Sequence, residues 1–510
     1  MFLVEELKMI KVYANRSVRK IENFWNNIHF HPTDAIEDEW GQRILNQVSA
    51  DGAARTVRMY TMFEDIVSMD ENGKLKYDFT LNDIRLDYMI SKGFDLLICY
   101  NFIPFCVADN PELVMANTKN KTRYKGKMIC TSPPKNDGVW EEMCYEYTKH
   151  IVEKYGFETV SRWKFHCLNE SDIANFFMSD LPNSEEAGAI RYERYIKLYK
   201  EFQRGIERVD KRLCFGGPSA AILYDRGSFV QKFSKAISDG EIRADFISIH
   251  TYGTTPPALN SGKKLFDARN TVELHKKYVE EIKKNLPNGI DIIVDEWGAA
   301  TAGFFNVENC TALMLREKSD FAAYFGKMIT AYIEEELPVS KMLICLSGQH
   351  EMVTDFSGFR NFFTLNFIKK PIYNAFVLGA KLGNELLEYD GGLDNTSVLA
   401  TKDGDRVALM LAYASKNFNE ELPNLCPTLD VEGIDGKRTV KIWCIDEEHT
   451  NPYALSLREN IGDNPSREQI ERMKEEGTLK PVKEYEQDFG QNNIIELKFT
   501  NNALVLVEIQ

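Results

Sequence analysis

The stretches WKFHCLNES (residues 163–171) and IIVDEWG (residues 292–298) decide how this chain folds. Each is an apolar, strand-like run that delivers a carboxylate at its end, Glu170 in the first and Glu296 in the second. A buried charge is costly unless it is paired or has a function. Two such residues far apart in the sequence therefore predict a pair of acids that meet at the ends of separate parallel strands.

Six further apolar runs accompany these two, with amphipathic helical stretches between them. Continuous apolar strands are typical of a parallel sheet covered on both faces. Eight strand–helix units ending near residue 350 predict an α/β fold, a (β/α)₈ TIM barrel. The alternative, an open doubly wound sheet, normally carries a Gly-rich phosphate loop after its first strand, and the sequence has none there. The expected strands are Asn27–Phe30, Arg55–Tyr60, Asp95–Asn101, Trp163–Leu168, Leu213–Gly217, Asp245–Tyr252, Asp291–Trp297 and Lys341–Leu346.

Beyond residue 370 the pattern changes to short alternating strands separated by turn residues, such as RVALMLAYAS (406–415) and ALVLVEIQ (503–510). This pattern is typical of an antiparallel β-sandwich. The run MIKVYA (9–14) also alternates and is expected to pair with the sandwich. We therefore predict an N-terminal strand segment over residues 1–20, a catalytic barrel over 21–370 and an accessory β-sandwich over 371–510.

The composition limits the partners and the compartment. A net charge of −15 argues against a nucleic-acid partner, because phosphate binding needs clustered Lys and Arg. The chain shows neither a signal-peptide pattern nor a membrane-spanning run, so no membrane partner is expected. Ten cysteines without a C-x-x-C pair indicate reduced thiols of a cytoplasmic protein, with no metal site and no cofactor. The oligomeric state stays open, homo-oligomer included.

Paired carboxylates at strand ends are the usual equipment for hydrolysing a glycosidic bond, one as proton donor and the other as nucleophile. The Asn169 amide beside Glu170 is suited to bind a sugar hydroxyl, and His250 and Tyr252 end the sixth expected strand. Each residue taken singly is more often structural. Their joint position at the ends of strands four, six and seven favours a catalytic site with a glycoside or oligosaccharide substrate.

Several stretches, in order along the chain, resemble glycoside hydrolase family 39, the group of β-xylosidases and α-L-iduronidases. They are YDFTLNDIRLDYMISKGFDLLICYNFIP (77–104), TSPPKNDGVWEEMCYEYTKHIVEKYGFETVSRWKF (131–165), ADFISIHTY (244–252) and IDEEHTNPYAL (445–455). The resemblance implies a (β/α)₈ barrel with an accessory β-sandwich and an exo-acting, β-xylosidase-like enzyme of the retaining type. It also implies that Glu170 is the acid/base and Glu296 the nucleophile.

The chain departs from the family pattern around the site. The pattern F-E-x-W-N-E-P reads FHCLNES (165–171) here, so a carboxylate, a Trp and a Pro are replaced. The pattern R-x-H-G reads RMYT (58–61), FHGGFGL becomes FSGFRNFFTL (356–365), and the polar run Gln349–Glu351 follows the eighth strand. We therefore expect the reaction type to be retained and the glycone or the linkage to differ from those of simple β-xylosides. The expected substrate-binding residues are Asn169, His250, Tyr252, Tyr60, Trp297 and His166.

Three alternatives remain open at this point. An iduronidase would need a cation for the sugar carboxylate, and no basic residue stands out for that role. A catalytically silent carbohydrate-binding protein would have no need of two costly carboxylates. A metal-dependent barrel lyase or isomerase would need several ligands, with Asp295, Glu296 and His250 as candidates. Adjacent strand residues are expected to point to opposite faces, which counts against the metal hypothesis.

Overall fold

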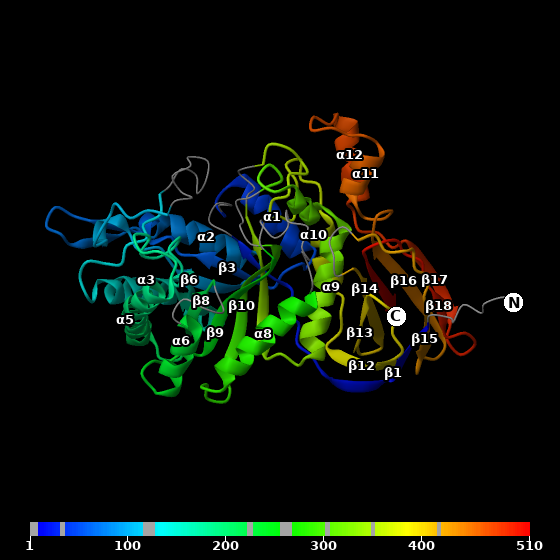
Figure 1. Ribbon diagram of the computed structural model, residues 1–510, viewed down its shortest axis with the longest axis horizontal. Helices are drawn as coiled ribbons and strands as arrows, with labels where there is room; N and C mark the ends of the chain where they lie inside the picture. The colour runs from blue at the N-terminus through cyan, green and yellow to red at the C-terminus, as the bar shows by residue number, and fades with distance from the viewer. Residues whose placement is uncertain are drawn as a thin grey trace.

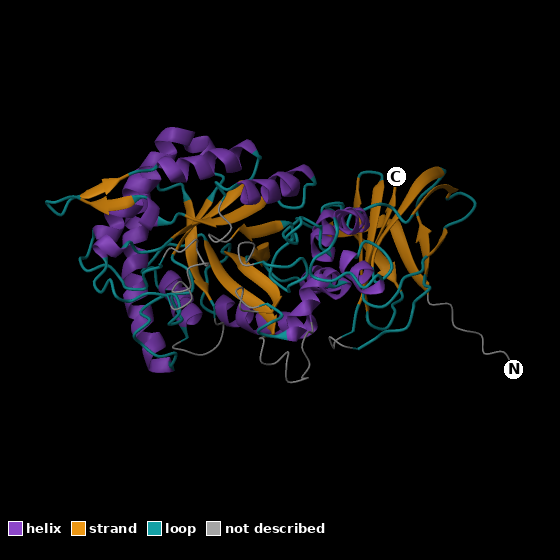
Figure 2. Cartoon of the chain, turned by 90° about the horizontal axis from the view of Figure 1, so that it is seen from above, coloured by secondary structure: helices purple, strands orange, loops and turns teal. Residues whose placement is uncertain are grey.

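The computed structural model describes residues 9–30, 36–115, 128–221, 228–254, 268–300, 306–347, 352–415 and 420–510. A closed barrel and a nine-stranded sheet lie beside each other along the long axis of the molecule, with helix α9 (Ser319–Glu334) between them (Figure 1). The view from above shows the barrel strands enclosed by helices and the sheet forming a separate layer (Figure 2). Within these ranges no helix is both long and apolar enough to cross a membrane.

The predicted TIM barrel is confirmed. Its eight strands pair in parallel and close around the axis in chain order. The floor of the barrel is apolar, formed by Leu97, Phe246, Ile293 and Leu343. Polar side chains fill the barrel above that floor, toward the carboxyl ends of the strands. The strands are β2 (Asn27–Phe30), β3 (Thr56–Tyr60), β6 (Asp95–Tyr100), β7 (Lys164–Cys167), β8 (Cys214–Ala220), β9 (Phe246–Thr254), β10 (Asp291–Ala300) and β11 (Val339–Leu346).

Amphipathic helices cover the outside of the barrel, because each has one apolar face to bury against the strands. The helices are α1 (Glu39–Ala50), α2 (Thr80–Ser91), α3 (Val139–Tyr155), α4 (Phe157–Val160), α5 (Glu185–Val209), α6 (Phe229–Ser238), α8 (Ala268–Lys283) and α10 (Pro371–Gly379). The connections contain the hairpin β4 (Val67–Met69) and β5 (Leu75–Tyr77) and the 3₁₀ turns η1 (Phe63–Asp65), η2 (Phe105–Val107) and η5 (Thr311–Glu317).

The second sheet belongs to the accessory β-sandwich and has its own apolar core. Strand β1 (Met9–Lys20) joins it, antiparallel to β12 (Glu385–Asp390) and parallel to β15 (Thr428–Glu432). The N-terminal run therefore pairs with the C-terminal strands, as its alternation indicates, although one of its two pairings is parallel. The other strands are β13 (Thr396–Asp403), β14 (Arg406–Tyr413), β16 (Lys437–Ile445), β17 (Lys483–Asp488), β18 (Ile494–Glu496) and β19 (Ala503–Ile509), with helices α11 (Pro452–Arg458) and α12 (Arg467–Glu476).

A buried ion pair joins the loops that follow the last two barrel strands. Lys370 Nζ lies 2.7 Å from Glu317 Oε1, and both side chains are almost completely excluded from water. The same carboxylate accepts a hydrogen bond from the Gly358 N–H, and Arg316 donates to the Gly358 carbonyl. The loop that carries Arg360 is therefore anchored from below by three charged residues.

Removal of the Lys370 charge is predicted to destabilise the barrel. In the variant Lys370→Met, Glu317 is left as a buried charge without its ammonium partner, which costs about 3–5 kcal/mol. Denaturant unfolding followed by tryptophan fluorescence measures this loss. The matched control is Lys480→Met, whose pair with Glu475 is exposed, and its effect should stay within about 1 kcal/mol. Equal effects of the two variants would contradict the prediction.

Candidate active site

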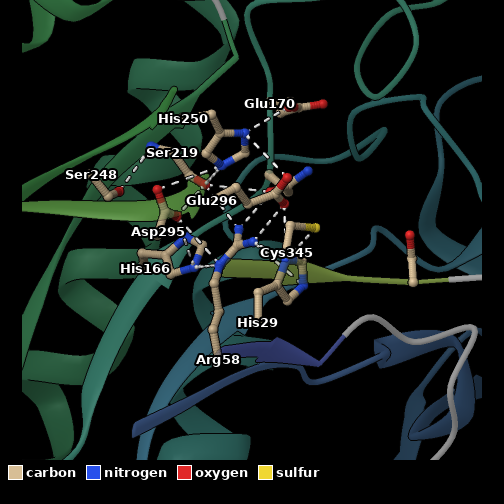
Figure 3. Close-up of polar contacts among 12 residues, drawn as sticks. His29, Arg58, His166, Glu170, Ser219, Ser248, His250, Asp295, Glu296 and Cys345 are labelled. Atoms are coloured by element: carbon tan, nitrogen blue, oxygen red, sulfur yellow. Dashed lines mark hydrogen bonds and ion pairs between the residues drawn. The ribbon is translucent and has the colours of Figure 1, made fainter. Parts of the chain in front are cut away.

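The two carboxylates predicted from the strand ends meet inside the barrel through one histidine. His250 Nδ1 lies 2.6 Å from Glu170 Oε1 and 3.7 Å from Glu296 Oε2 (Figure 3). Oxygen atoms of the two carboxylates lie within 4.8 Å of one another. Their side chains are 13% and 7% exposed. This residual exposure lets a substrate reach both carboxylates from the open end of the barrel.

Glu170 is held by a tight turn directly after β7. Leu168 and Glu170 both have positive φ values, 56° and 46°. Such values are uncommon outside glycine and persist where the surroundings over-determine them. Here the Glu170 N–H donates to the Ser219 carbonyl at 3.0 Å, which ties the turn to strand β8. The turn directs the Glu170 side chain toward His250 on strand β9.

Strand β10 contains a β-bulge that brings two neighbouring acids into the barrel. In its pairing with β9, Val294 faces Ile249 and Glu296 faces His250, so Asp295 is an additional residue. A bulge breaks the alternation of side chains between the two faces of a strand. Asp295 and Glu296 consequently both contact Arg58, at 3.3 and 2.8 Å. The expectation that these two residues point to opposite faces is therefore wrong, and the bulge is the reason.

Arg58, on strand β3, is the centre of the cluster, and its side chain is fully buried. Besides the two acids of β10, its guanidinium donates to four side chains from four other elements of the barrel wall. These are His29 Nδ1 at 3.0 Å, His166 Nε2 at 3.1 Å, Asn169 Oδ1 at 2.5 Å and Ser219 Oγ at 2.9 Å. The guanidinium therefore fixes the position of Glu296 and of the Asn169 amide at the same time.

The second oxygen of Glu296 is held by a chain that reaches the loop after β11. Tyr252 OH donates to Glu296 Oε2 at 2.7 Å and accepts from Arg360 Nη1 at 2.7 Å. Arg360 Nε in turn donates to Ser347 Oγ at 3.3 Å. Both oxygens of Glu296 thus have fixed donors, Arg58 on one side and Tyr252 on the other. A carboxylate oriented in this way is fixed before any ligand binds.

The environment moves the pKa values of the two acids in opposite directions. Burial raises the pKa of Glu170, and the hydrogen bond from His250 offsets this only in part. Burial alone would also raise the pKa of Glu296, but the positive charges of His250 and Arg58, together with the polar contact of His29, outweigh it and hold this pKa well below the usual range. Burial lowers the pKa of His250, yet Glu296 and Asp295 raise it overall to about 10. The site therefore holds one carboxyl able to keep a proton beside one that is ionised.

The predicted binding residues divide into three groups. Asn169, Tyr60, His250 and Tyr252 lie at the cluster, and the buried Asn169 Nδ2 has no hydrogen-bond partner in the described part of the chain. His166 lies beneath them, fully buried, with its Nε2 on Arg58. Trp297 lies outside the cluster, because the bulge turns it toward the helices, where it is 1% exposed and stacks on Phe376. The expected polar residues Gln349–Glu351 fall outside the described residues.

Four further residues of the site were not singled out from the sequence as site residues: His29, Arg58, Ser219 and Arg360. Arg58 and His29 carry the signal that identified Glu170 and Glu296, a polar side chain in or at the end of an apolar strand, in TVRMY and NIHF. Ser219 carries no such signal, because serine is unremarkable in a strand. Arg360 lies in a loop without periodicity, and its role depends on where that loop folds.

The acids and histidines of the site also offer metal-ligand geometry. Among the described residues, Glu170 with His250 and Glu296, and His29 with Glu296 and Cys345, each bring three donor atoms within 4.8 Å. The Arg58 guanidinium already occupies the space beside Glu296 Oε1 and His29 Nδ1. A cation bound to Glu296 and His29 would have to displace this internal one. The donor set therefore fits a metal ion poorly.

Comparison with known proteins identifies the family. The family model described as glycosyl hydrolases family 39 matches residues 8–493. A β-xylosidase of Caldicellulosiruptor saccharolyticus is 25% identical over 94% of each chain. An α-L-iduronidase of Canis lupus familiaris is 22% identical over 57% of this chain and 41% of its own. The crystal structure of a monomeric β-xylosidase from Caulobacter crescentus superposes with a TM-score of 0.82 at 19% identity, over 99% of both chains.

The cluster predicts a pH-dependent loss of stability when Arg58 is replaced. With Arg58 present, the pKa of Asp295 is lowered to about 2, although burial opposes this, and the pKa of Glu296 is lowered as well. The two ionised acids therefore stabilise the folded state at pH values above their pKa in the unfolded chain, which is about 4. This contribution is lost as the pH falls through their lowered pKa values in the folded protein. In Arg58→Met both acids stay buried without the guanidinium, so they take up protons as the pH falls below neutral. We expect a loss of about 3–5 kcal/mol at pH 7 that shrinks toward pH 4.

Thermal and denaturant unfolding at several pH values checks this prediction. The control is Arg212→Met, since Arg212 is 71% exposed and its ion pair with Asp210 lies at the surface. A small, pH-independent loss in Arg58→Met, equal to that of the control, would contradict the proposed charge cluster.

Proposed function

The chain belongs to glycosyl hydrolase family 39 and is a glycosidase, and on this premise we propose that it cleaves a terminal glycosidic bond by a retaining double displacement. The observation that carries the proposal is the pair Glu170 and Glu296, with carboxylate oxygens within 4.8 Å and pKa values displaced in opposite directions. Retaining enzymes hold their carboxyl groups about 5–5.5 Å apart, whereas inverting enzymes leave about 6.5–9.5 Å for a water molecule. The short separation supports the retaining mechanism.

In the first step, the ionised Glu296 attacks the anomeric carbon and forms a glycosyl ester. Glu170 gives its proton to the glycosidic oxygen, and the C–O bond to the leaving group breaks. In the second step, Glu170 takes a proton from water, the water oxygen attacks the anomeric carbon, and Glu296 leaves as a carboxylate. The donors Arg58 and Tyr252 keep Glu296 ionised and oriented before attack.

The Asn169 amide is the proposed contact for the sugar hydroxyl next to the anomeric carbon. Arg58 holds its oxygen at 2.5 Å, which leaves Nδ2 buried with no described acceptor. A buried donor without a partner is costly, and a substrate hydroxyl would satisfy it. Tyr60 and Tyr252 complete the proposed sugar-binding set. Trp297 and His166 do not belong to this proposed sugar-binding set. Trp297 packs against the helices, and His166 lies beneath Arg58.

Arg360 favours an acidic sugar as the second candidate for the glycone. No basic residue stands out in the sequence as a partner for a sugar carboxylate. In the structure, however, the half-buried Arg360 side chain lies 2.7 Å from Tyr252 OH, and Tyr252 in turn contacts Glu296. Its pKa stays raised, since the neighbouring Cys345, Tyr252 and Glu296 outweigh the effect of burial, so the guanidinium is cationic. A guanidinium binds a carboxylate through two parallel hydrogen bonds. The similarity to an enzyme named α-L-iduronidase agrees with this candidate.

The site counts against the alternative that the sequence left open, a catalytically silent carbohydrate-binding protein. Such a protein would account for the replaced residues in FHCLNES, and it requires no difference between the two acids. The opposite pKa displacements of Glu170 and Glu296 and the donors on both oxygens of Glu296 favour the enzyme.

The two carboxylates are predicted to respond differently to removal. Glu296→Ala should lower kcat more than about 10⁴-fold for every glycoside, because the nucleophile is lost. Glu170→Ala should lower kcat by a similar factor for substrates with poor leaving groups. It should spare the first step for dinitrophenyl glycosides, because dinitrophenolate leaves without needing a proton. A fluorinated glycosyl inactivator should label Glu296, as mass spectrometry of peptides shows. The control Glu142→Ala removes an exposed acid of α3 and should change neither rate. Wild-type turnover in Glu296→Ala would overturn the mechanism.

The acidic-sugar candidate predicts a change of specificity. The wild type should hydrolyse aryl uronides with higher kcat/KM than the matched neutral glycosides, and Arg360→Gln should lower the uronide value about 10- to 100-fold more than the neutral value. The matched control is Tyr252→Phe, which keeps Arg360 and removes the donor to Glu296. It should lower both values by the same factor. A wild type that prefers neutral sugars, or an equal loss on both in Arg360→Gln, would reject the acidic glycone.

A further inference from the structure

The buried guanidinium of Arg58 has a carboxylate partner in an unexpected place. The family pattern F-E-x-W-N-E-P puts a carboxylate at position 166, where this chain has histidine. His166 Nε2 lies 3.1 Å from Arg58 Nε and 3.8 Å from Asp295 Oδ2. The carboxylate that is absent from strand β7 is therefore matched by one on strand β10, on the same edge of the guanidinium.

Asp295 reaches this position through the bulge in β10 and is completely buried. Its Oδ2 lies 3.3 Å from Arg58 Nε and accepts a hydrogen bond from Ser219 Oγ at 2.6 Å. Its Oδ1 lies 3.5 Å from His250 Nε2. One carboxylate thus contacts both cations of the cluster, the guanidinium that holds Glu296 and the imidazole that holds Glu170 (Figure 3).

We propose that Asp295 is a positioning residue, which supplies a counter-ion for Arg58 from the seventh barrel strand in place of the carboxylate that the family pattern has at position 166, and which holds Arg58 against Glu296 and His250 against Glu170. The positioning role rests on the function proposed above, since it assigns Asp295 to the support of the two catalytic carboxylates. The exchange of the counter-ion between two strands concerns stability, and it rests on the contacts of Arg58 with Asp295 and His166 together with the family pattern at position 166.

The charges of the cluster agree with this role. Arg58 and a protonated His250 contribute two positive charges, and Asp295 and Glu296 contribute two negative ones, which leaves Glu170 free to be neutral. Among the described residues, the other groups that face His250, its partner acids or Arg58 are His29, His166, Ser219, Cys99, Cys345, Tyr60 and Tyr252, and Asp172 beside Glu170. Burial lowers the pKa of His29 to about 4 and that of His166 to about 3, so these two rings are neutral. Without Asp295 the cluster would carry one uncompensated positive charge.

The first experiment moves the carboxylate back to strand β7. Asp295→Asn should lower the melting temperature, because Arg58 then lacks one of its counter-ions. His166→Glu should also lower it, because two carboxylates then lie on the same edge of the Arg58 guanidinium. Each loss should be roughly 5–15 °C. The double variant His166→Glu/Asp295→Asn restores the charge balance and should recover most of the loss. Losses that add in the double variant would overturn the exchange.

The second experiment measures the positioning role in Asp295→Asn. Removal of a negative charge beside His250 lowers the pKa of His250 and of Glu170, so both lose their protons at lower pH. The alkaline limb of the kcat/KM profile should therefore move to lower pH by about one unit. The control Asp446→Asn removes another buried carboxylate, which accepts the Thr500 N–H in the accessory domain. It should lower the melting temperature and leave the pH profile unchanged. An unmoved limb in Asp295→Asn would overturn the positioning role.

The two experiments separate this inference from the proposed function. A wild type inactive on every glycoside would refute the proposed function, and with it the positioning role in catalysis. The melting temperatures of the four proteins would still decide whether Asp295 replaces the carboxylate at position 166. Additive melting losses in an active enzyme would refute the exchange and leave the glycosidase assignment intact.

Discussion

The Arg58 guanidinium is excluded from water and bonds to side chains from five other elements of the barrel wall. An arginine does not lose its proton in a protein, so its charge must be balanced where it lies. This requirement draws Glu296 and Asp295 inward and fixes the Asn169 oxygen and Ser219 around one planar group. Closure of the barrel is what makes the arrangement attainable, because β3 and β10 are not neighbours in the sheet. The catalytic geometry that we propose follows from balancing one buried charge.

The apolar runs predict the barrel well, since a strand buried on both faces needs continuous apolar sequence whatever its partners are. All eight expected strands lie within three residues of the observed bounds. The same reasoning located Glu170 and Glu296. It failed at Asp295, because strict alternation puts neighbours on opposite faces and a bulge cannot be read from DEW alone. The expectation that Trp297 binds the sugar is not supported either, since Trp297 follows Glu296 and lies on the outer face of β10. Arg360 was out of reach for another reason: its contact with Tyr252 depends on how a loop without periodicity is anchored.

The accessory domain contributes to that anchoring and to the packing of strand β10, which carries Glu296. Helix α9 packs against its sheet so closely that a Cβ at Gly326 would lie 2.6 Å from Leu504 and 2.8 Å from Ala412. The neighbouring Phe325 stacks on Trp297, the residue after Glu296. On the other side, Tyr453 of α11 contacts Phe356 in the loop that carries Arg360. Burial of Trp297 thus has a structural reason, since it couples β10 to the helix shared with the second domain.

The departures from the family pattern fall into two classes with different consequences. The histidine at position 166 lies beneath Arg58, where we propose Asp295 as the counter-ion, so we expect this change to concern the internal charge balance and not the sugar. Leu168 is 3% exposed in the apolar core, and its change concerns packing. Tyr60 and Arg360 differ from these, because they lie beside the groups that face the open end of the barrel. Specificity depends on directed contacts with sugar hydroxyls and charges. The identity of the glycone is therefore to be sought at Tyr60 and Arg360.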